Sequence, residues 1–227
     1  MRRPVLFALW LFIALSACSR THDPAEAPVA STPAPETAPV IKPDDRKILA
    51  VFGDSIAAGY GLPAGKSFPD YLQKKLDAAG YAWHVVNLGI SGDTTEGGLA
   101  RIDSAISLKP SIVLLELGGN DGLRGMPQAS TRQNLDQMIV AFQKAGAKVV
   151  LAGMSLPPNY GPDYIRGFEN IYKDLAAKYH LPLIRFLLAD IVTKDLRYIQ
   201  PDGIHPTADG SEIVAGTVLT AVKPLLN

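Results

Sequence analysis

The chain has 227 residues with 22 basic and 22 acidic side chains, and 47% of its residues are hydrophobic. This length suits one domain of ordinary size with a sizeable core, and the composition argues against global disorder. The balanced charge excludes the broad basic surface of a nucleic-acid-binding protein. A single cysteine excludes an internal disulfide framework and a cysteine-rich zinc module.

The first 17 residues have the pattern of an export signal. Met1-Arg2-Arg3 is a basic start, and an apolar stretch follows over residues 5–17. A helix needs ~20 apolar residues to cross a bilayer, so this stretch is too short for a membrane span and is typical of a secretory signal peptide. We therefore expect the mature protein to be exported.

The end of that stretch, Leu15-Ser16-Ala17-Cys18, resembles the bacterial lipobox, in which the cysteine is lipidated and the chain is cut before it. The resemblance implies removal of residues 1–17 and a lipid anchor at Cys18. Ser19 follows in place of the aspartate of the inner-membrane retention signal, so we expect an outer-membrane lipoprotein that faces the periplasm. The alternative is ordinary cleavage nearby, with Cys18 incidental.

Residues 18–45 comprise this cysteine and a proline- and alanine-rich linker. Six of the eighteen prolines fall here, Ala and Thr fill most of the gaps, and no hydrophobic period appears. Such a segment cannot bury a core and favours extended, partly polyproline backbone. We expect a tether that holds the following domain, residues 46–227, away from a lipid surface.

Apolar runs alternate with helix-like stretches from residue 47 onward. The predicted strands cover residues 48–52, 84–88, 111–117, 148–152 and 181–186. The predicted helices cover residues 68–79, 99–108, 131–145, 164–179 and 211–226. Strands that alternate with helices form a mostly parallel sheet, and continuous apolar runs fit strands that are covered on both faces. The sequence predicts one three-layer α/β/α domain.

In such sheets ligands bind at the carboxyl ends of the strands, so the loops after the strands carry the candidate site. Ser55 follows the first strand, within Gly53-Asp54-Ser55, at a place where a nucleophile could stand. A serine there is also a common helix N-cap. Glycine-rich polar loops follow the second and third strands and contain Gly92 and Asn120.

An acid and a histidine share one turn near the C-terminus, Asp202-Gly203-Ile204-His205. The acid can hold one ring nitrogen of the histidine and leave the other free as a base. A serine hydroxyl needs an oriented base to become a nucleophile, and the developing oxyanion needs donors already in place. Ser55, this pair, the Gly92 amide and the Asn120 side-chain amide supply each of these parts.

Four blocks of the chain match, in order, the blocks of the SGNH hydrolases, also called GDSL esterases/lipases. They are Gly53-Asp54-Ser55, Gly92, Gly118-Gly119-Asn120-Asp121 and Asp202-x-x-His205. The chain therefore resembles this family over residues 47–226. Further matches at residues 90–94, 97–101, 116–125 and 158–161 look like its multifunctional bacterial thioesterase/lysophospholipase/arylesterase branch. The resemblance implies the family's fold, with a five-stranded, flavodoxin-like sheet.

The resemblance also gives each block a role. It implies that Ser55 attacks an ester or thioester carbonyl, that His205 transfers the proton and that Asp202 orients the imidazole. The backbone N–H groups of Ser55 and Gly92 and the side chain of Asn120 would hold the oxyanion. No cofactor and no metal are implied. The expected partner is a small ester or thioester, not a nucleic acid or a nucleotide.

Residues that bind the acyl group are less clearly marked. Pro158, Asn159 and Tyr160 follow the fourth strand, in a segment whose family counterpart shapes the acyl pocket, although a proline-stiffened connector has the same composition. Leu123 and Met126 lie just beyond the third-strand loop and are similar candidates. A shallow apolar groove of this kind favours acyl or aryl esters over sugars.

Nucleotide binding is not expected, although Gly65-Lys66-Ser67 ends like a phosphate loop. Tyr60 occupies the position at which that motif requires its first glycine, and Pro63 interrupts the segment. The G-x-S-x-G pattern of the α/β-hydrolase nucleophile elbow occurs nowhere in this chain.

The leading hypothesis is a serine esterase or thioesterase that acts on acyl or aryl esters, lysophospholipids among them. A second hypothesis, motivated by location and fold, is an O-deacetylase of cell-envelope carbohydrate. A third, from another class, is a tethered binding module that kept the fold and lost catalysis. The complete set of triad and oxyanion residues argues against the third.

Overall fold

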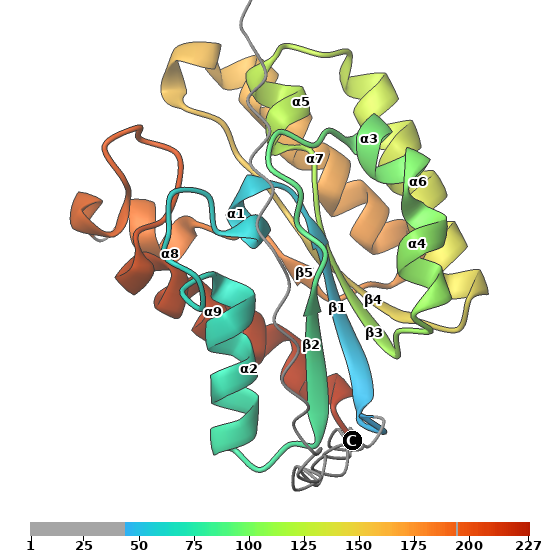
Figure 1. Cartoon of the computed structure of the whole chain (residues 1–227). Coiled ribbons are helices and arrows are strands. Elements are labelled where there is room, and N and C mark those ends of the chain that lie inside the picture. Colours follow the sequence, from blue (N-terminus) through green and yellow to red (C-terminus); the bar gives the residue numbers. More distant parts are fainter. Residues whose placement is uncertain (1–43, 194) are drawn as a thin grey trace, which may run out of the picture. The chain divides into compact units, whose positions relative to one another are not determined.

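A five-stranded parallel sheet forms the centre of the computed structural model, which describes residues 44–193 and 195–227 (Figure 1). Its strands run in the order β2-β1-β3-β4-β5. They are β1 (Lys47–Gly53), β2 (Trp83–Asn87), β3 (Ile112–Glu116), β4 (Lys148–Ala152) and β5 (Leu183–Ile184). This is the flavodoxin-like order that the family resemblance implied, so the predicted fold class is confirmed.

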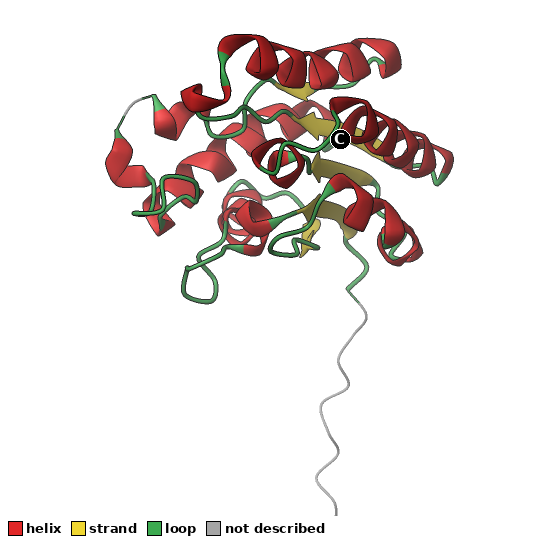
Figure 2. Ribbon diagram, turned by 90° about the horizontal axis from the view of Figure 1, so that it is seen from above, coloured by secondary structure: helices red, strands yellow, loops and turns green. Residues whose placement is uncertain are grey.

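Helices cover both faces of the sheet, as the view along its edge shows (Figure 2). One layer contains α2 (Phe68–Ala78), α9 (Ala208–Val222) and the short α8 (Ala189–Val192). The other contains α3 (Thr95–Ala100), α4 (Ile102–Ser107), α6 (Gln128–Lys144) and α7 (Pro162–Tyr179). Two one-turn helices, α1 (Ser55–Ala58) and α5 (Gly119–Leu123), follow β1 and β3 directly. Short 3₁₀ turns occupy Pro158–Tyr160, Leu196–Tyr198 and Lys223–Leu225.

The apolar strand runs become the core because helices shield both of their faces from water. Every residue of β3 is buried, and residues 49–53 of β1 are buried as well. Local side chains cap the N-termini of two of these helices. Ser67 and Asp70 form a capping box at the start of α2, and Thr207 is the N-cap of α9.

The structure corrects the predicted elements at several places. The expected helix at residues 99–108 is two helices, since Arg101 leaves helical geometry and its guanidinium reaches Asp93 at 2.7 Å and the Gly53 carbonyl at 3.0 Å. The short helices α1, α5 and α8 were not predicted, because four or five residues give no readable period. The last strand has two residues instead of the predicted six.

The predicted signal peptide, Cys18 and nearly all of the proline-rich linker lie outside the described residues. Among the residues that are described, no helix combines the length and the apolar character needed to cross a bilayer.

Candidate active site

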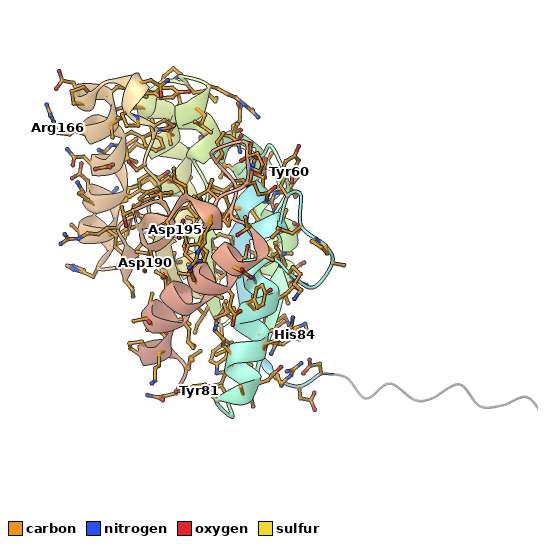
Figure 3. The ribbon with its side chains drawn as sticks, turned by 90° about the vertical axis from the view of Figure 1, so that its left-hand side faces the viewer. Tyr60, Tyr81, His84, Arg166, Asp190 and Asp195 are labelled. Carbon is orange, nitrogen blue, oxygen red and sulfur yellow. The ribbon has the colours of Figure 1, made fainter. Side chains whose placement is uncertain are left out.

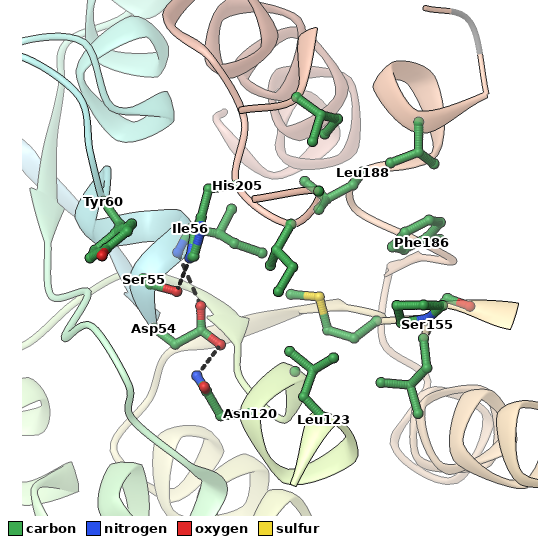
Figure 4. A pocket seen from close by; sticks show the side chains of 18 of the residues that line it. Asp54, Ser55, Ile56, Tyr60, Asn120, Leu123, Ser155, Phe186, Leu188 and His205 are labelled. Carbon is green, nitrogen blue, oxygen red and sulfur yellow. Dashed lines mark hydrogen bonds between the residues drawn. The ribbon is translucent and has the colours of Figure 1, made fainter. Parts of the chain in front are cut away.

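Ser55 stands at the junction between the interior strand β1 and the single turn of α1. Asp54 forms the N-cap of that turn, because its carboxylate accepts a hydrogen bond from the Ile56 amide at 3.1 Å. The cap role considered for the serine thus falls to its neighbour, and the Ser55 side chain is left to face the cavity (Figure 4). Gly59, with φ +76°, ends the turn.

His205 meets Ser55 across the carboxyl ends of the strands. Its Nε2 lies 2.8 Å from the Ser55 hydroxyl oxygen, and its Nδ1 lies 2.6 Å from a carboxylate oxygen of Asp202. Three side chains from two loops thus form one hydrogen-bonded chain. Because Asp202 occupies Nδ1, the neutral ring presents an unprotonated Nε2 to the hydroxyl, as a general base requires.

Asp202 is held in its ionised form by the turn that contains it. Partial desolvation would raise its pKa, but backbone N–H groups of His205 and Ile204 donate to the carboxylate at 3.0 and 2.9 Å. Together with the imidazole they outweigh desolvation and lower the pKa of Asp202 below its ordinary value. The acid therefore remains a charged acceptor for the imidazole at neutral pH.

The Gly92 amide belongs to a tight turn in which the Asp93 amide donates to the Ile90 carbonyl at 3.1 Å. Gly92 has φ +82°, a conformation that favours glycine, so the sequence places glycine where this turn requires it. Within the described part of the chain, neither the Gly92 N–H nor the Ser55 N–H donates a hydrogen bond to another protein group. Both donors remain available to an oxyanion.

Asn120, in the first turn of α5, points its amide at the same place. Its Nδ2 donates to the Asp93 carbonyl at 2.9 Å and lies 3.3 Å from a carboxylate oxygen of Asp54. The first contact orients the amide, while the second is long and can yield its hydrogen to a stronger acceptor. The loops after β1, β2 and β3 thus contribute one oxyanion donor each.

A pair of buried carboxyl groups lies behind the nucleophile. Glu116, at the end of β3, is fully buried and accepts a hydrogen bond from the Asp54 amide at 3.1 Å. Burial raises the pKa of Asp54 to about 6, and burial and the charge of Asp54 raise the pKa of Glu116 well above its usual range. Burial thus favours the neutral form of Glu116, and both acids lie against the nucleophile turn.

A cavity of about 490 Å³ opens beside Ser55 and His205 (Figure 4). Most of its polar residues lie at the triad and oxyanion loops, and Ser155, after β4, is a further one. The remainder of its wall is mainly apolar and includes Leu123, Met154, Leu156, Phe186, Leu188, Val192, Leu196, Ile199 and Ile204. A site that combines one polar corner with an apolar hollow fits a ligand with one reactive polar group and an apolar body.

Two of the five predicted substrate-binding residues, Leu123 and Pro158, line this cavity. Met126, Asn159 and Tyr160 do not belong to its lining, contrary to expectation. The hydroxyl of Tyr160 donates to the Leu123 carbonyl at 2.7 Å, so Tyr160 braces the cavity wall from behind. Asn159 is exposed, and Met126 follows Gly125, with φ +63°, beyond the end of α5.

The sequence reading missed one whole wall of the cavity. Phe186, Leu188, Val192, Leu196 and Ile199 all follow β5, the strand whose loop was not considered. The rule that ligands lie at the carboxyl ends of strands applies to this loop as well and could have found it. Tyr60 also lines the cavity, but in the sequence it stood out only as the residue that breaks a phosphate-loop motif.

Comparison with known proteins agrees with this geometry. The model of the GDSL-like Lipase/Acylhydrolase family matches residues 51–213. Esterase TesA of Pseudomonas aeruginosa is 45% identical over 179 residues, which cover 78% of this chain and 89% of that protein. Thioesterase 1/protease 1/lysophospholipase L1 of Escherichia coli is 38% identical over 180 residues, which cover 79% and 85%.

A solved structure gives the same result. The psychrotrophic esterase EstA from Pseudoalteromonas sp., in a crystal structure inhibited by monoethylphosphonate, aligns with a TM-score of 0.75 at 32% identity. The alignment covers 80% of this chain and 99% of that one. The match in sequence and the match in fold together show that this chain belongs to the GDSL-like lipase/acylhydrolase family, the SGNH hydrolases.

Proposed function

We propose that the protein hydrolyses acyl or aryl esters and thioesters through an acyl-enzyme formed on Ser55. The observation that carries this proposal is the unbroken hydrogen-bonded chain from Asp202 through His205 to Ser55, set at the mouth of an apolar cavity. A hydroxyl that is paired with an oriented base and faces a hollow for the substrate is the arrangement that acyl transfer requires.

In the first half-reaction the Ser55 oxygen adds to the substrate carbonyl while His205 Nε2 takes its proton. The carbonyl oxygen becomes an oxyanion, which the Ser55 and Gly92 N–H groups and the Asn120 amide can hold. The C–O or C–S bond then breaks, and the imidazolium gives its proton to the departing alcohol or thiol. Asp202 stabilises the imidazolium in between.

In the second half-reaction a water molecule replaces the leaving group. His205 takes a proton from that water as its oxygen attacks the Ser55 ester. The second tetrahedral intermediate uses the same oxyanion donors. Its collapse returns the proton to the Ser55 oxygen and releases the carboxylic acid, so the enzyme is regenerated without any redox step.

The cavity supports an acyl or aryl substrate over a sugar. Its wall beyond the oxyanion corner is mainly aliphatic and aromatic, and buried apolar area favours chains that leave water. The related Escherichia coli protein is named for thioesterase and lysophospholipase activity, which fits the same substrate chemistry. We propose a preference for apolar acyl groups in this chain as well.

We further propose that the enzyme is exported and tethered to the outer membrane through a lipid on Cys18. The support is the lipobox-like Leu15-Ser16-Ala17-Cys18 and the proline-rich linker after it. A Cys18→Ser variant is expected to leave the membrane fraction and to lose lipid mass. If it fractionates with the membrane as before, the anchor proposal is wrong.

Initial rates on p-nitrophenyl acetate, p-nitrophenyl octanoate and an O-acetylated glycan test the substrate class. The account expects the two aryl esters to be hydrolysed and the glycan to react poorly, with all activity lost in Ser55→Ala. A strong preference for the glycan would instead establish the carbohydrate deacetylase. Folded protein that cleaves none of the three would favour the binding module.

A further inference from the structure

Gln200 lies at the point where the turn that carries the base meets the turn that carries the nucleophile. The base turn has little packing of its own, since residues 201–204 are exposed. These exposed residues give His205 little packing support, although its own side chain is only 15% exposed. Apart from the His205–Ser55 hydrogen bond itself, the hydrogen bond among the described residues that crosses between the two turns comes from Gln200.

Gln200 forms hydrogen bonds with both the base turn and the nucleophile turn. Its backbone N–H donates to the His205 carbonyl at 2.7 Å, and its side-chain Nε2 donates to the Pro206 carbonyl at 2.8 Å. The same Nε2 donates to the Tyr60 carbonyl at 2.8 Å. The Tyr60 N–H in turn donates to the carbonyl of Ser55 at 3.0 Å. An unbroken series of hydrogen bonds thus joins the backbone of the nucleophile to the backbone of the base.

Two further features surround the hydrogen bond from Gln200 to the Tyr60 carbonyl. Gly61 has φ +74°, and a Cβ at that position would stand 2.5 Å from the Gln200 Oε1, so only glycine lets the side chain lie there. The ring of Tyr60 packs on the His205 imidazole with 4.6 Å between the ring centres. Tyr60 is 54% exposed, at the end of the molecule opposite His84 and Tyr81 (Figure 3), so the solvent side of this junction is open.

We propose that Gln200 is a positioning residue that sets the distance between the Ser55 hydroxyl and His205 Nε2. It touches neither substrate nor reacting atoms and acts through the Tyr60 and His205 backbones. The inference rests on the proposed function for its effect on rate, but its structural consequence can be measured without any substrate.

Gln200→Met keeps the size of the side chain and removes both donors. The matched control is Gln73→Met. Gln73 lies in α2, and its side-chain Nε2 donates to the carbonyl of Trp83 in β2 at 3.0 Å, away from the cavity. On p-nitrophenyl acetate, Gln200→Met is expected to lower kcat by ~10–100-fold with KM changed less than twofold, since small misplacements of reacting groups have effects of this order. Gln73→Met is expected to keep the wild-type kcat.

The substrate-free readout is the ¹⁵N chemical shift of His205 Nε2, which reports the hydrogen bond from Ser55. In Gln200→Met it is expected to move toward the value found in Ser55→Ala, where that bond cannot form. Gly61→Ala would crowd the Gln200 Oε1 and also strain the backbone at φ +74°. It is expected to move the shift likewise and serves as the second variant if Gln200→Met folds poorly.

A wild-type shift and a kcat within twofold of wild type in these variants would overturn the proposal. An equal loss of kcat in Gln73→Met would also overturn it, because the loss would then reflect general destabilisation. If the wild type cleaves no ester, the proposed function fails, and the ¹⁵N shift still decides the role of Gln200.

Discussion

The imidazole Nε2 of His205 lies 2.8 Å from the hydroxyl oxygen of Ser55, although 150 positions of sequence separate them. The parallel sheet makes this contact possible, because Ser55 follows the interior strand β1 and the base turn, near the C-terminus, returns to the same carboxyl edge of the sheet. Both residues sit in turns whose local hydrogen bonds, not their side-chain burial, fix where they point.

Replacement of Asp202 by Asn is expected to lower kcat by ~10⁴-fold, because the amide favours the wrong imidazole tautomer. The pKa of Asp202 already lies below its ordinary value, so its ionised form persists as the pH falls from 7 to 5. The wild-type profile of kcat/KM should therefore contain no step from Asp202 in that window. An Asp202 carboxyl that titrates above its ordinary pKa of 3.8, followed by its ¹³C chemical shift, would contradict the assignment.

Replacement of Asn120 by Ala is expected to lower kcat by ~10²–10³-fold with little change in KM, since the amide is needed only once the oxyanion forms. Asn134→Ala is the control, because Asn134 bonds to Thr95 on the helical layer and not to the cavity. Steady-state rates on p-nitrophenyl acetate decide the matter. A loss confined to KM would assign Asn120 to substrate binding instead.

The buried carboxyl of Asp54 should make stability depend on pH. Its pKa in the folded protein is about 6, against 3.8 ordinarily, so the folded state holds this proton more tightly than the unfolded state. The free energy of unfolding should then fall by about 2 kcal/mol as the pH rises from 4 to 6 and by about 3 kcal/mol over the whole titration.

Urea unfolding of wild type and Asp54→Asn at several pH values measures this contribution as a difference. The difference curve should decline across that window and level off above about pH 7. A difference that rises with pH would show that the folded state favours the ionised form of Asp54. Glu116→Gln should keep the fold and the activity, because burial favours the neutral form of Glu116.

The acyl cavity can be shortened at Leu123, which lines it and is only partly buried. Leu123→Trp is expected to lower the ratio of octanoate to acetate hydrolysis by ~10-fold or more, because a long acyl chain loses its apolar contact while acetate does not need it. Leu108→Trp, at an exposed site, serves as the control. An unchanged ratio would place the acyl group elsewhere.

The sequence predicted most of the fold because its signals are long. Apolar runs such as residues 111–117 fit only strands covered on both faces, and the periods of α2, α6, α7 and α9 span several turns. The break at Arg101 depends on a carboxylate eight residues away and on the Gly53 carbonyl, which no local pattern reveals. The one-turn helices α1 and α5 likewise depend on their tertiary surroundings.

The site divides in the same way. Ser55, Asp202 and His205 could be found because their chemistry restricts the residue types and their turns have marked sequences. The apolar wall after β5 uses residues such as Leu188 and Ile199 that core positions use equally well, so composition does not distinguish it. The Gln200 side chain donates to backbone carbonyls of other residues. Because every residue has a backbone carbonyl, such a contact does not restrict the residue type of its acceptor, and the sequence gives no sign of it.

The most direct test of the account is to treat the folded protein with a fluorophosphonate and to locate the adduct by mass spectrometry. The account predicts a single phosphonyl group on Ser55, formed rapidly in wild type and lost in His205→Ala, because the serine is reactive only beside its base. An adduct on a different residue, or a folded protein in which Ser55 stays unmodified, would contradict it.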